Sequence, residues 1–184
     1  MKTTISSVLE QFTSTYINNW KQQTGFPPVS AELYGIPSPC VIRTGDEAVY
    51  WEPQPFPIAN ATLQSVANAL EITLQEDIHP FYTSQLAGDM AAEFEGLSIN
   101  LLQVWREEDF TRLQQNLIGH LVTQKRLKLP PTLFIATMES DLEMVSLCNI
   151  SGEVIVEKFG SKERRVIAPD LATFIVGLIP VVTS

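Results

Sequence analysis

The chain holds only two cysteines and two histidines among its 184 residues. Cys40 and Cys148 are too few and too far apart for a disulfide framework or a zinc site, which predicts reduced thiols. His79 and His120 have no nucleophile, metal-ligand pair or phosphate loop at a meaningful spacing. We therefore expect no catalytic residue, no metal and no cofactor.

Long hydrophobic runs are also missing. The longest late run, residues 174–182, is interrupted by Pro180 and is far shorter than the ~20 residues that a membrane span needs. The amino-terminal residues show neither the apolar stretch nor the cleavage site of a signal peptide. The sequence thus predicts a protein that is not exported and does not cross a membrane.

Positive charge is scarce in the first part of the chain. Residues 1–109 carry 14 Asp and Glu against 4 Lys and Arg (−10), whereas residues 110–184 carry 7 against 8 (+1). An acidic surface attracts basic partners and disfavours nucleic acid and anionic lipid as direct ligands. The charge pattern predicts a basic protein segment as the partner. The alternative is an acidic surface that only keeps the protein soluble.

Length and hydrophobic periodicity predict one α+β domain over residues 1–184, with a mostly antiparallel sheet. A first helix is expected from about residue 5 to Gly25, with Ser7 and Glu10 as a capping box. Further helices are expected around residues 63–70, from residue 106 to the Pro130-Pro131 stop, and after Pro169. Strands are expected at residues 48–51, 90–94, 97–105, 132–136, 142–148 and 154–158.

Several long segments resemble those of Syd, the family of SecY-interacting proteins of bacteria. They are ELYGIPSPC at residues 32–40, AVYWEPQPF at 48–56, FYTSQLAGDM at 81–90, and a longer match at 116–153 that begins NLIGHLVTQKRLKLPP. The resemblance implies a non-enzymatic, SUKH-like α+β domain. It also implies peripheral docking on the cytoplasmic side of the inner membrane by binding cytoplasmic loops of SecY, the translocon subunit. We expect the protein to be a monomer.

The role implied by the resemblance is to sense or sequester SecY that is not properly assembled, with restraint of translocation as a further effect. Cytoplasmic loops of membrane proteins are enriched in Lys and Arg. An acidic groove is therefore a suitable receptor for them, in agreement with the charge pattern. Six acidic residues are candidates for lining that groove: Glu32, Asp46, Glu47, Glu52, Asp89 and Glu108.

Each candidate also has a plain structural explanation. The first four lie in or beside a Pro-rich loop region, where ordinary solvation explains any one acid. Asp89 follows Gly88 and is expected first as a turn former. Glu108 stands in the first turn of a helix, spaced to pair with Arg112. These structural explanations stay open at the sequence level.

Basic residues gather at the far end of the long helix. Lys125, Arg126 and Lys128, together with Lys158, Lys162, Arg164 and Arg165, are candidates for a patch that touches lipid headgroups after docking. Complementation of the helix dipole and solvation of a hairpin turn explain the same residues without a function.

The alternative function is a small acid/base hydrolase that uses Glu52, Asp89 or His79. Such an enzyme requires these groups to converge in a pocket with separated pKa values. An enclosed pocket that contains them would favour the enzyme, and an open acidic groove would favour the binding module.

Overall fold

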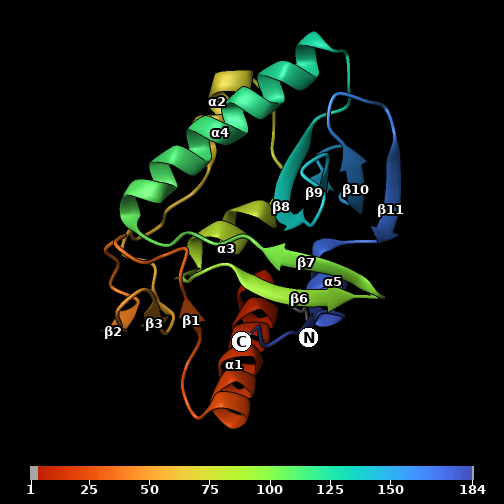
Figure 1. Cartoon of the computed structure of the whole chain (residues 1–184). Coiled ribbons are helices and arrows are strands. Elements are labelled where there is room, and N and C mark those ends of the chain that lie inside the picture. The colour runs from red at the N-terminus through yellow and green to blue at the C-terminus, as the bar shows by residue number, and fades with distance from the viewer. Residues whose placement is uncertain (1–3, 184) are drawn as a thin grey trace.

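A curled sheet of seven strands dominates the fold, which is described for residues 4–183 by a computed structural model (Figure 1). Neighbouring strands are antiparallel throughout this sheet. From edge to edge the strands are β11 (Arg164–Ala168), β10 (Val154–Lys158), β9 (Glu143–Cys148), β8 (Thr132–Met138), β7 (Leu97–Leu101), β6 (Met90–Phe94) and β12 (Ile179–Pro180). The expected α+β class with a mostly antiparallel sheet is confirmed.

The β6–β7 hairpin forms where the sequence predicts it. Glu95 and Gly96 both have positive φ angles, 47° and 86°, as in the tight two-residue turns that join antiparallel strands. β7 nevertheless ends before the expected end at residue 105. The N–H of Leu102 still donates to the Ile135 carbonyl of β8 at 2.9 Å, and beyond it the indole Nε1 of Trp105 donates to the Ile36 carbonyl at 2.9 Å.

Helix α1 (Ile5–Thr24) shows the predicted apolar periodicity. It ends at Gly25, whose φ of 81° is the left-handed conformation common after helix ends. The predicted capping box is wrong: the N-cap is Thr4, whose side-chain oxygen accepts the Ser7 N–H at 3.2 Å, so Ser7 already lies inside the helix. The buried residues of α1 are Ile5, Val8, Leu9, Phe12, Thr13, Tyr16, Ile17 and Trp20.

The other helices pack around the sheet. α4 (Glu107–Arg126) runs diagonally over the top of the molecule in Figure 1 and packs on α2 (Gln64–Leu70). α5 (Leu171–Val176) packs on α1, and its N-cap Asp170 accepts the Thr173 N–H at 2.7 Å. α3 (Ile78–Thr83) was not expected: six residues are too few to show a helical period, and the equally short α5 was expected because of its Pro169-Asp170 start.

The Pro-rich region folds into short strands. β1 (Val29–Ser30), β3 (Val49–Trp51) and β2 (Val41–Thr44) form a three-stranded sheet in that order. β4 (Gln54–Pro55) pairs with β5 (Gln85–Leu86). Only β3 was expected. Strands of two to four residues carry too little alternation to be recognised, and their pairing depends on tertiary contacts.

Trp51 joins this small sheet to the rest of the protein. Its side chain is only 2% exposed; its ring stacks with Tyr16 and meets Trp105 edge-on, both at 6.2 Å between centroids. Gly88 passes directly beside the indole, and a Cβ at this position would lie 2.8 Å from the ring. The close packing of these residues builds the walls of the hollow described below.

Two further findings concern the expectations on membranes and thiols. Within residues 4–183, no helix has the length and apolar character needed to cross a membrane. Cys40 is buried and Cys148 is half-buried, and both are free thiols.

Candidate functional site: an acidic hollow

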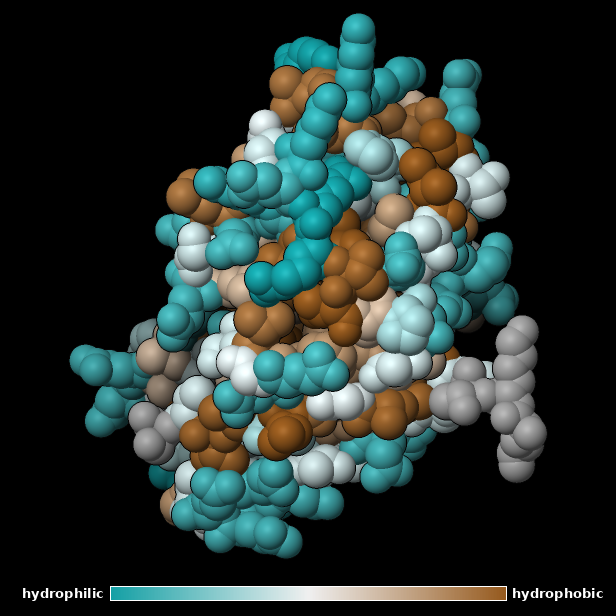
Figure 2. All heavy atoms as spheres, turned by 90° about the vertical axis from the view of Figure 1, so that its right-hand side faces the viewer, coloured by the Kyte–Doolittle hydropathy of each residue, from teal (hydrophilic) through white to brown (hydrophobic). Residues whose placement is uncertain are grey.

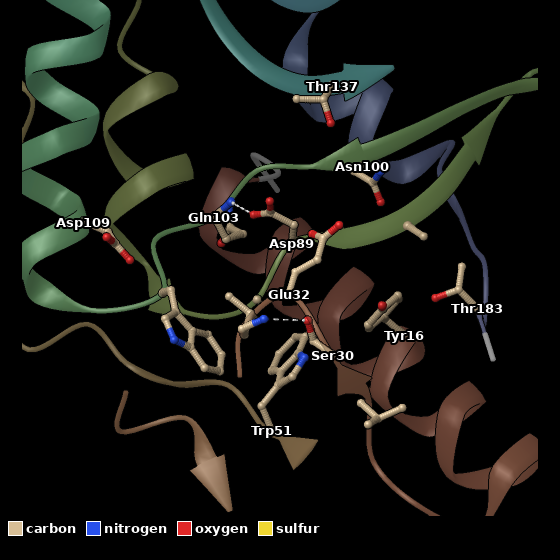
Figure 3. A pocket seen from close by; sticks show the side chains of 15 residues that line it. Tyr16, Ser30, Glu32, Trp51, Asp89, Asn100, Gln103, Asp109, Thr137 and Thr183 are labelled. Atoms are coloured by element: carbon tan, nitrogen blue, oxygen red, sulfur yellow. Dashed lines mark hydrogen bonds between the residues drawn. The ribbon is translucent and has the colours of Figure 1, made fainter. Parts of the chain in front are cut away.

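A hollow of about 520 Å³ opens where α1, the small sheet, the start of β6 and the start of α4 meet (Figure 3). We call it the acidic hollow. Its lining includes three carboxylates and three large aromatic rings, and none of its lining residues is Lys or Arg. The carboxylates are Glu32, Asp89 and Asp109, and the rings are Tyr16, Trp51 and Trp105.

The three carboxylates come from distant parts of the chain. Glu32 follows β1, Asp89 precedes β6 and Asp109 lies in the first turn of α4. Figure 3 shows Asp89 and Glu32 side by side in the middle of the hollow, with Asp109 to one side. Tertiary folding therefore brings together like charges that are far apart in sequence.

Asp89 is held by the segment that follows β7. One oxygen, Oδ1, accepts the backbone N–H of Gln103 at 3.3 Å. Gln103 is fixed in turn because its side-chain amide donates to the carbonyls of Phe81 (3.1 Å) and Leu102 (2.8 Å) and accepts from Gln85 (3.1 Å). The carboxylate of Asp89 is thus oriented by a rigid hydrogen-bonded support.

The pKa of Asp89 is raised from 3.8 to about 6. Water reaches this side chain, but the walls of the hollow replace most of its bulk hydration, and this desolvation is the main cause. The hydrogen bond from Gln103 opposes the shift, and the charges of Glu32 and Asp109 add to it. The charged form is therefore costly, and a nearby cation would relieve the cost.

The aromatic walls are rigid. Tyr16, Trp51 and Trp105 are each at most 4% exposed, so only a small part of each ring borders the hollow. Burial raises the pKa of the Tyr16 hydroxyl, which keeps that group neutral. The hollow therefore combines ionised groups at its surface with an apolar support that limits hydration.

The structure brings together only some of the predicted acids. Glu32 and Asp89 lie in the hollow, and Asp89 sits in extended chain before β6 rather than in a turn. Asp46 and Glu47 lie in the connection between β2 and β3 and do not line the hollow. Glu52 does not line it either, and its carboxylate is paired with Lys21 at 2.7 Å.

Glu108 also lies outside the lining of the hollow. The predicted pair with Arg112 is wrong, because Glu108 reaches Arg106 at 3.8 Å and Arg112 instead bonds Asp109 at 3.0 Å. Sequence reasoning missed Asp109 as a lining residue, since the first turn of a helix already explains an acid there.

The groups of the hydrolase alternative do not meet in one pocket. Neither Glu52 nor His79 lines the acidic hollow that contains Asp89. The Nδ1 atom of His79 accepts the Leu63 N–H at 2.9 Å, and burial lowers its pKa. Among residues 4–183, no group of three or more His, Cys, Asp and Glu is placed to hold a metal ion.

His120 belongs to a second, buried polar cluster between α4 and the strands β8, β10 and β11. Its Nε2 lies 2.9 Å from the Thr132 hydroxyl, which donates to Glu157 at 2.6 Å. Gln124 donates to both Thr132 (2.7 Å) and Glu157 (3.2 Å), and Arg164 lies 3.8 Å from Glu157. We call these five residues the buried network.

The predicted basic patch lies at the same end of the molecule. Lys125, Arg126 and Lys128 are exposed at the end of α4. The β10–β11 hairpin reaches this end, because Arg164 donates to the Pro130 carbonyl at 2.8 Å. On the face shown in Figure 2, hydrophobic atoms form separate patches between hydrophilic side chains. Exposed apolar residues of this half of the chain include Leu142, Phe159 and Val166.

Comparison with known proteins gives one consistent answer. The family model described as Syd protein (SUKH-2) matches residues 6–180. Three curated relatives, each named Protein Syd, are 58% identical to this chain over 98% of both sequences. They come from Pectobacterium carotovorum subsp. carotovorum, Photorhabdus laumondii subsp. laumondii and Yersinia enterocolitica.

Proposed function

The chain belongs to the Syd family, and from this premise we propose that it is a non-catalytic binding protein whose acidic hollow receives basic cytoplasmic loops of SecY. The observation that carries the proposal is the gathering of Glu32, Asp89 and Asp109 around one hollow whose lining includes no Lys or Arg. Asp109 is paired with Arg112 and Arg106 outside the lining, whereas no cation among residues 4–183 forms an ion pair with Glu32 or Asp89. Lys and Arg side chains of a bound loop would supply the missing positive charge.

The physical case rests on the repulsion inside the hollow. Glu32 and Asp109 both help to raise the pKa of Asp89, so folding holds these carboxylates near one another against their mutual repulsion. A cation between them reverses the sign of the interaction. The apolar support strengthens the attraction, because water competes less well for the charges. The site is thus prepared for a positive ligand before the ligand arrives.

The proposed cellular role follows from the partner. By holding exposed basic loops, the protein would sense or sequester SecY that is not properly assembled and would restrain translocation. It would act as a monomer, on the cytoplasmic side of the inner membrane, and be recruited there by SecY. The protein would be attached to the membrane peripherally, through its binding to SecY.

The proposal is tested by binding to SecY in detergent with matched charge variants. Glu32→Lys with Asp89→Asn changes the net charge by the same amount as Glu139→Lys with Glu143→Gln, and the second pair lies around the β8–β9 connection. Close interfacial charge pairs contribute ~1.5 kcal/mol or more, so the hollow variant should bind at least about tenfold more weakly. The control variant should bind as the parent does. Equal losses would show that only bulk charge matters, and full binding by the hollow variant would refute the proposal.

The basic patch of Lys125, Arg126 and Lys128 is proposed as a secondary contact with anionic headgroups after docking. This contact is supported by the exposure of the three side chains at one end of α4, away from the acidic hollow. Replacing all three residues by Gln should weaken binding to SecY in vesicles that contain phosphatidylglycerol, but not in phosphatidylcholine vesicles. Equal binding in both lipids by the parent protein would contradict this contact.

A further inference from the structure

A second hollow, of about 480 Å³, lies beside the acidic one. We call it the apolar hollow. It is lined by Tyr34, Gly35, Ile36, Pro37, Ser38, Val41, Thr44 and Val49. Most of these side chains are apolar and none is charged. Tyr34 at its rim is 46% exposed, which leaves part of the ring free to contact a partner.

The two hollows share one wall. Four residues of segment 29–33 line the acidic hollow, all but Ala31, and the next residues, 34–38, line the apolar hollow. This wall is fixed by Trp105, whose indole donates to the Ile36 carbonyl at 2.9 Å and whose carbonyl accepts from Ser38 at 2.6 Å. Trp105 also lines the acidic hollow. The same residue therefore fixes the wall and borders the acidic hollow.

Strand β3 fixes the spacing of the two hollows. Val49 lines the apolar hollow and Trp51 lines the acidic one, and both point inward from the same face of the strand. Residues two apart in a strand are separated by about 7 Å. If an extended segment bound across the wall, two of its residues that are two or three positions apart in sequence would each place a side chain in one of the hollows.

We propose, as a deepening of the proposed function and resting on it, that the apolar hollow takes an apolar side chain of the same loop whose Lys or Arg enters the acidic hollow. The site then selects loops in which a basic residue and a Leu, Ile, Val or aromatic residue are two or three positions apart. Basic loops without that apolar neighbour bind more weakly.

The neighbouring acids argue for this occupant. A second copy of the chain would bring its own net charge of −9 against the carboxylates beside the apolar hollow, and like charges across an interface are unfavourable. A basic loop is attracted to the same place. The apolar contact removes hydrocarbon from water, so it does not weaken with salt as the charge contact does.

The test uses one variant that removes the rim and one that fills the hollow. Tyr34→Ser truncates the exposed ring, and Thr44→Trp places an indole in the hollow from an exposed position on β2. The control is Phe159→Ser, an aromatic residue of similar exposure, 42%, in the β10–β11 hairpin. Each hollow variant should bind detergent-solubilised SecY about threefold to tenfold more weakly, by the same factor at low and at high salt. The control should bind as the parent does.

Two peptides of equal charge separate this inference from the proposed function. They are the acetylated and amidated Gly-Lys-Ser-Leu-Ser-Lys-Gly and its counterpart with Ser in place of Leu. The Leu peptide should bind the parent more tightly, and Thr44→Trp should abolish the difference. Equal affinities, or unchanged SecY binding by both hollow variants, would overturn the inference while leaving the acidic site intact. If Glu32→Lys with Asp89→Asn leaves SecY binding unchanged, the proposed function is overturned instead.

Discussion

The acidic hollow and the buried network use carboxylates in opposite ways. In the network, Glu157 is only 3% exposed, yet its oxygens are met by Thr132, Gln124 and Arg164. In the hollow, Glu32 and Asp89 remain open to water and stand beside another acid. The comparison teaches that a buried carboxylate with a full set of partners serves the fold. The carboxylates of Glu32 and Asp89, with which no cation among residues 4–183 forms an ion pair, are available to a ligand.

His120 is held in the network by several neighbours. Its ring contacts Thr132 and lies against Phe134, with 5.5 Å between ring centroids. Burial lowers its pKa; the charge of Glu157 opposes this shift and Arg164 adds to it. The Thr132 hydroxyl is engaged with Gln124, Glu157 and His120 at once, so it is not free to act as a nucleophile. This geometry gives His120 a structural role.

The largest effect is expected from breaking the network. Glu157→Leu removes the acceptor of Thr132 and Gln124 and leaves Arg164 without its carboxylate. The buried donors of Thr132 and Gln124 would then lack an acceptor and the Arg164 charge would lack its partner, so the free energy of unfolding should fall by about 3 kcal/mol. Urea unfolding measures this loss, and SecY binding by the folded fraction should be unchanged. A stable Glu157→Leu protein with weakened binding would reverse the roles assigned to the two regions.

In the hollow, the opposite change in stability is expected. Because the folded pKa of Asp89 is about 6 and its unfolded value is near 3.8, its contribution to stability is fully present below pH 3.8 and is lost as pH rises through 6. Asp89→Asn removes the costly charge, so it should raise the melting temperature at pH 7 while weakening SecY binding several-fold. The gain should shrink towards pH 4, and a lower melting temperature at pH 7 would contradict the assignment.

Acidification should have a smaller effect on the parent protein. Protonation of Asp89 removes one negative charge from the hollow, so affinity for SecY should fall a few-fold as pH drops from 7 to 5, with a midpoint near 6. Titration of binding against pH, in parent and Asp89→Asn proteins, measures the effect. The variant should lose the step near pH 6, and an identical step in both proteins would assign it to another group.

The smallest effect is expected from the acids outside the hollow. Sequence reasoning placed Glu47 and Glu52 in the groove, whereas the geometry leaves Glu47 in the β2–β3 connection and pairs Glu52 with Lys21. Reversing both to Lys should weaken binding by no more than about threefold, mainly through slower association, because exposed charges act at long range and are screened by salt. A tenfold loss that persists at high salt would extend the site to these residues.

Long periodic segments and charge content were readable from the sequence. α1 and α4 show their buried faces in the spacing of apolar residues, and the Glu95-Gly96 signal locates the β6–β7 hairpin. The family could be recognised as well, because contiguous stretches such as residues 116–131 match without knowledge of the fold. All these features depend on residues that are close together in the chain.

The position of the binding site was decided only by tertiary structure. Glu32, Asp89 and Asp109 meet because β1, β6 and α4 converge, and Gly88 lets Trp51 pack under them. The two-residue strand β1 escaped prediction for a related reason, since its partner β3 lies about twenty residues further along the chain. β2 and β11 were also missed, although each pairs with its neighbour in sequence, β3 and β10. Composition determines how much acid the protein carries, whereas the approach of distant segments determines which acids share a hollow and which are neutralised by a neighbour.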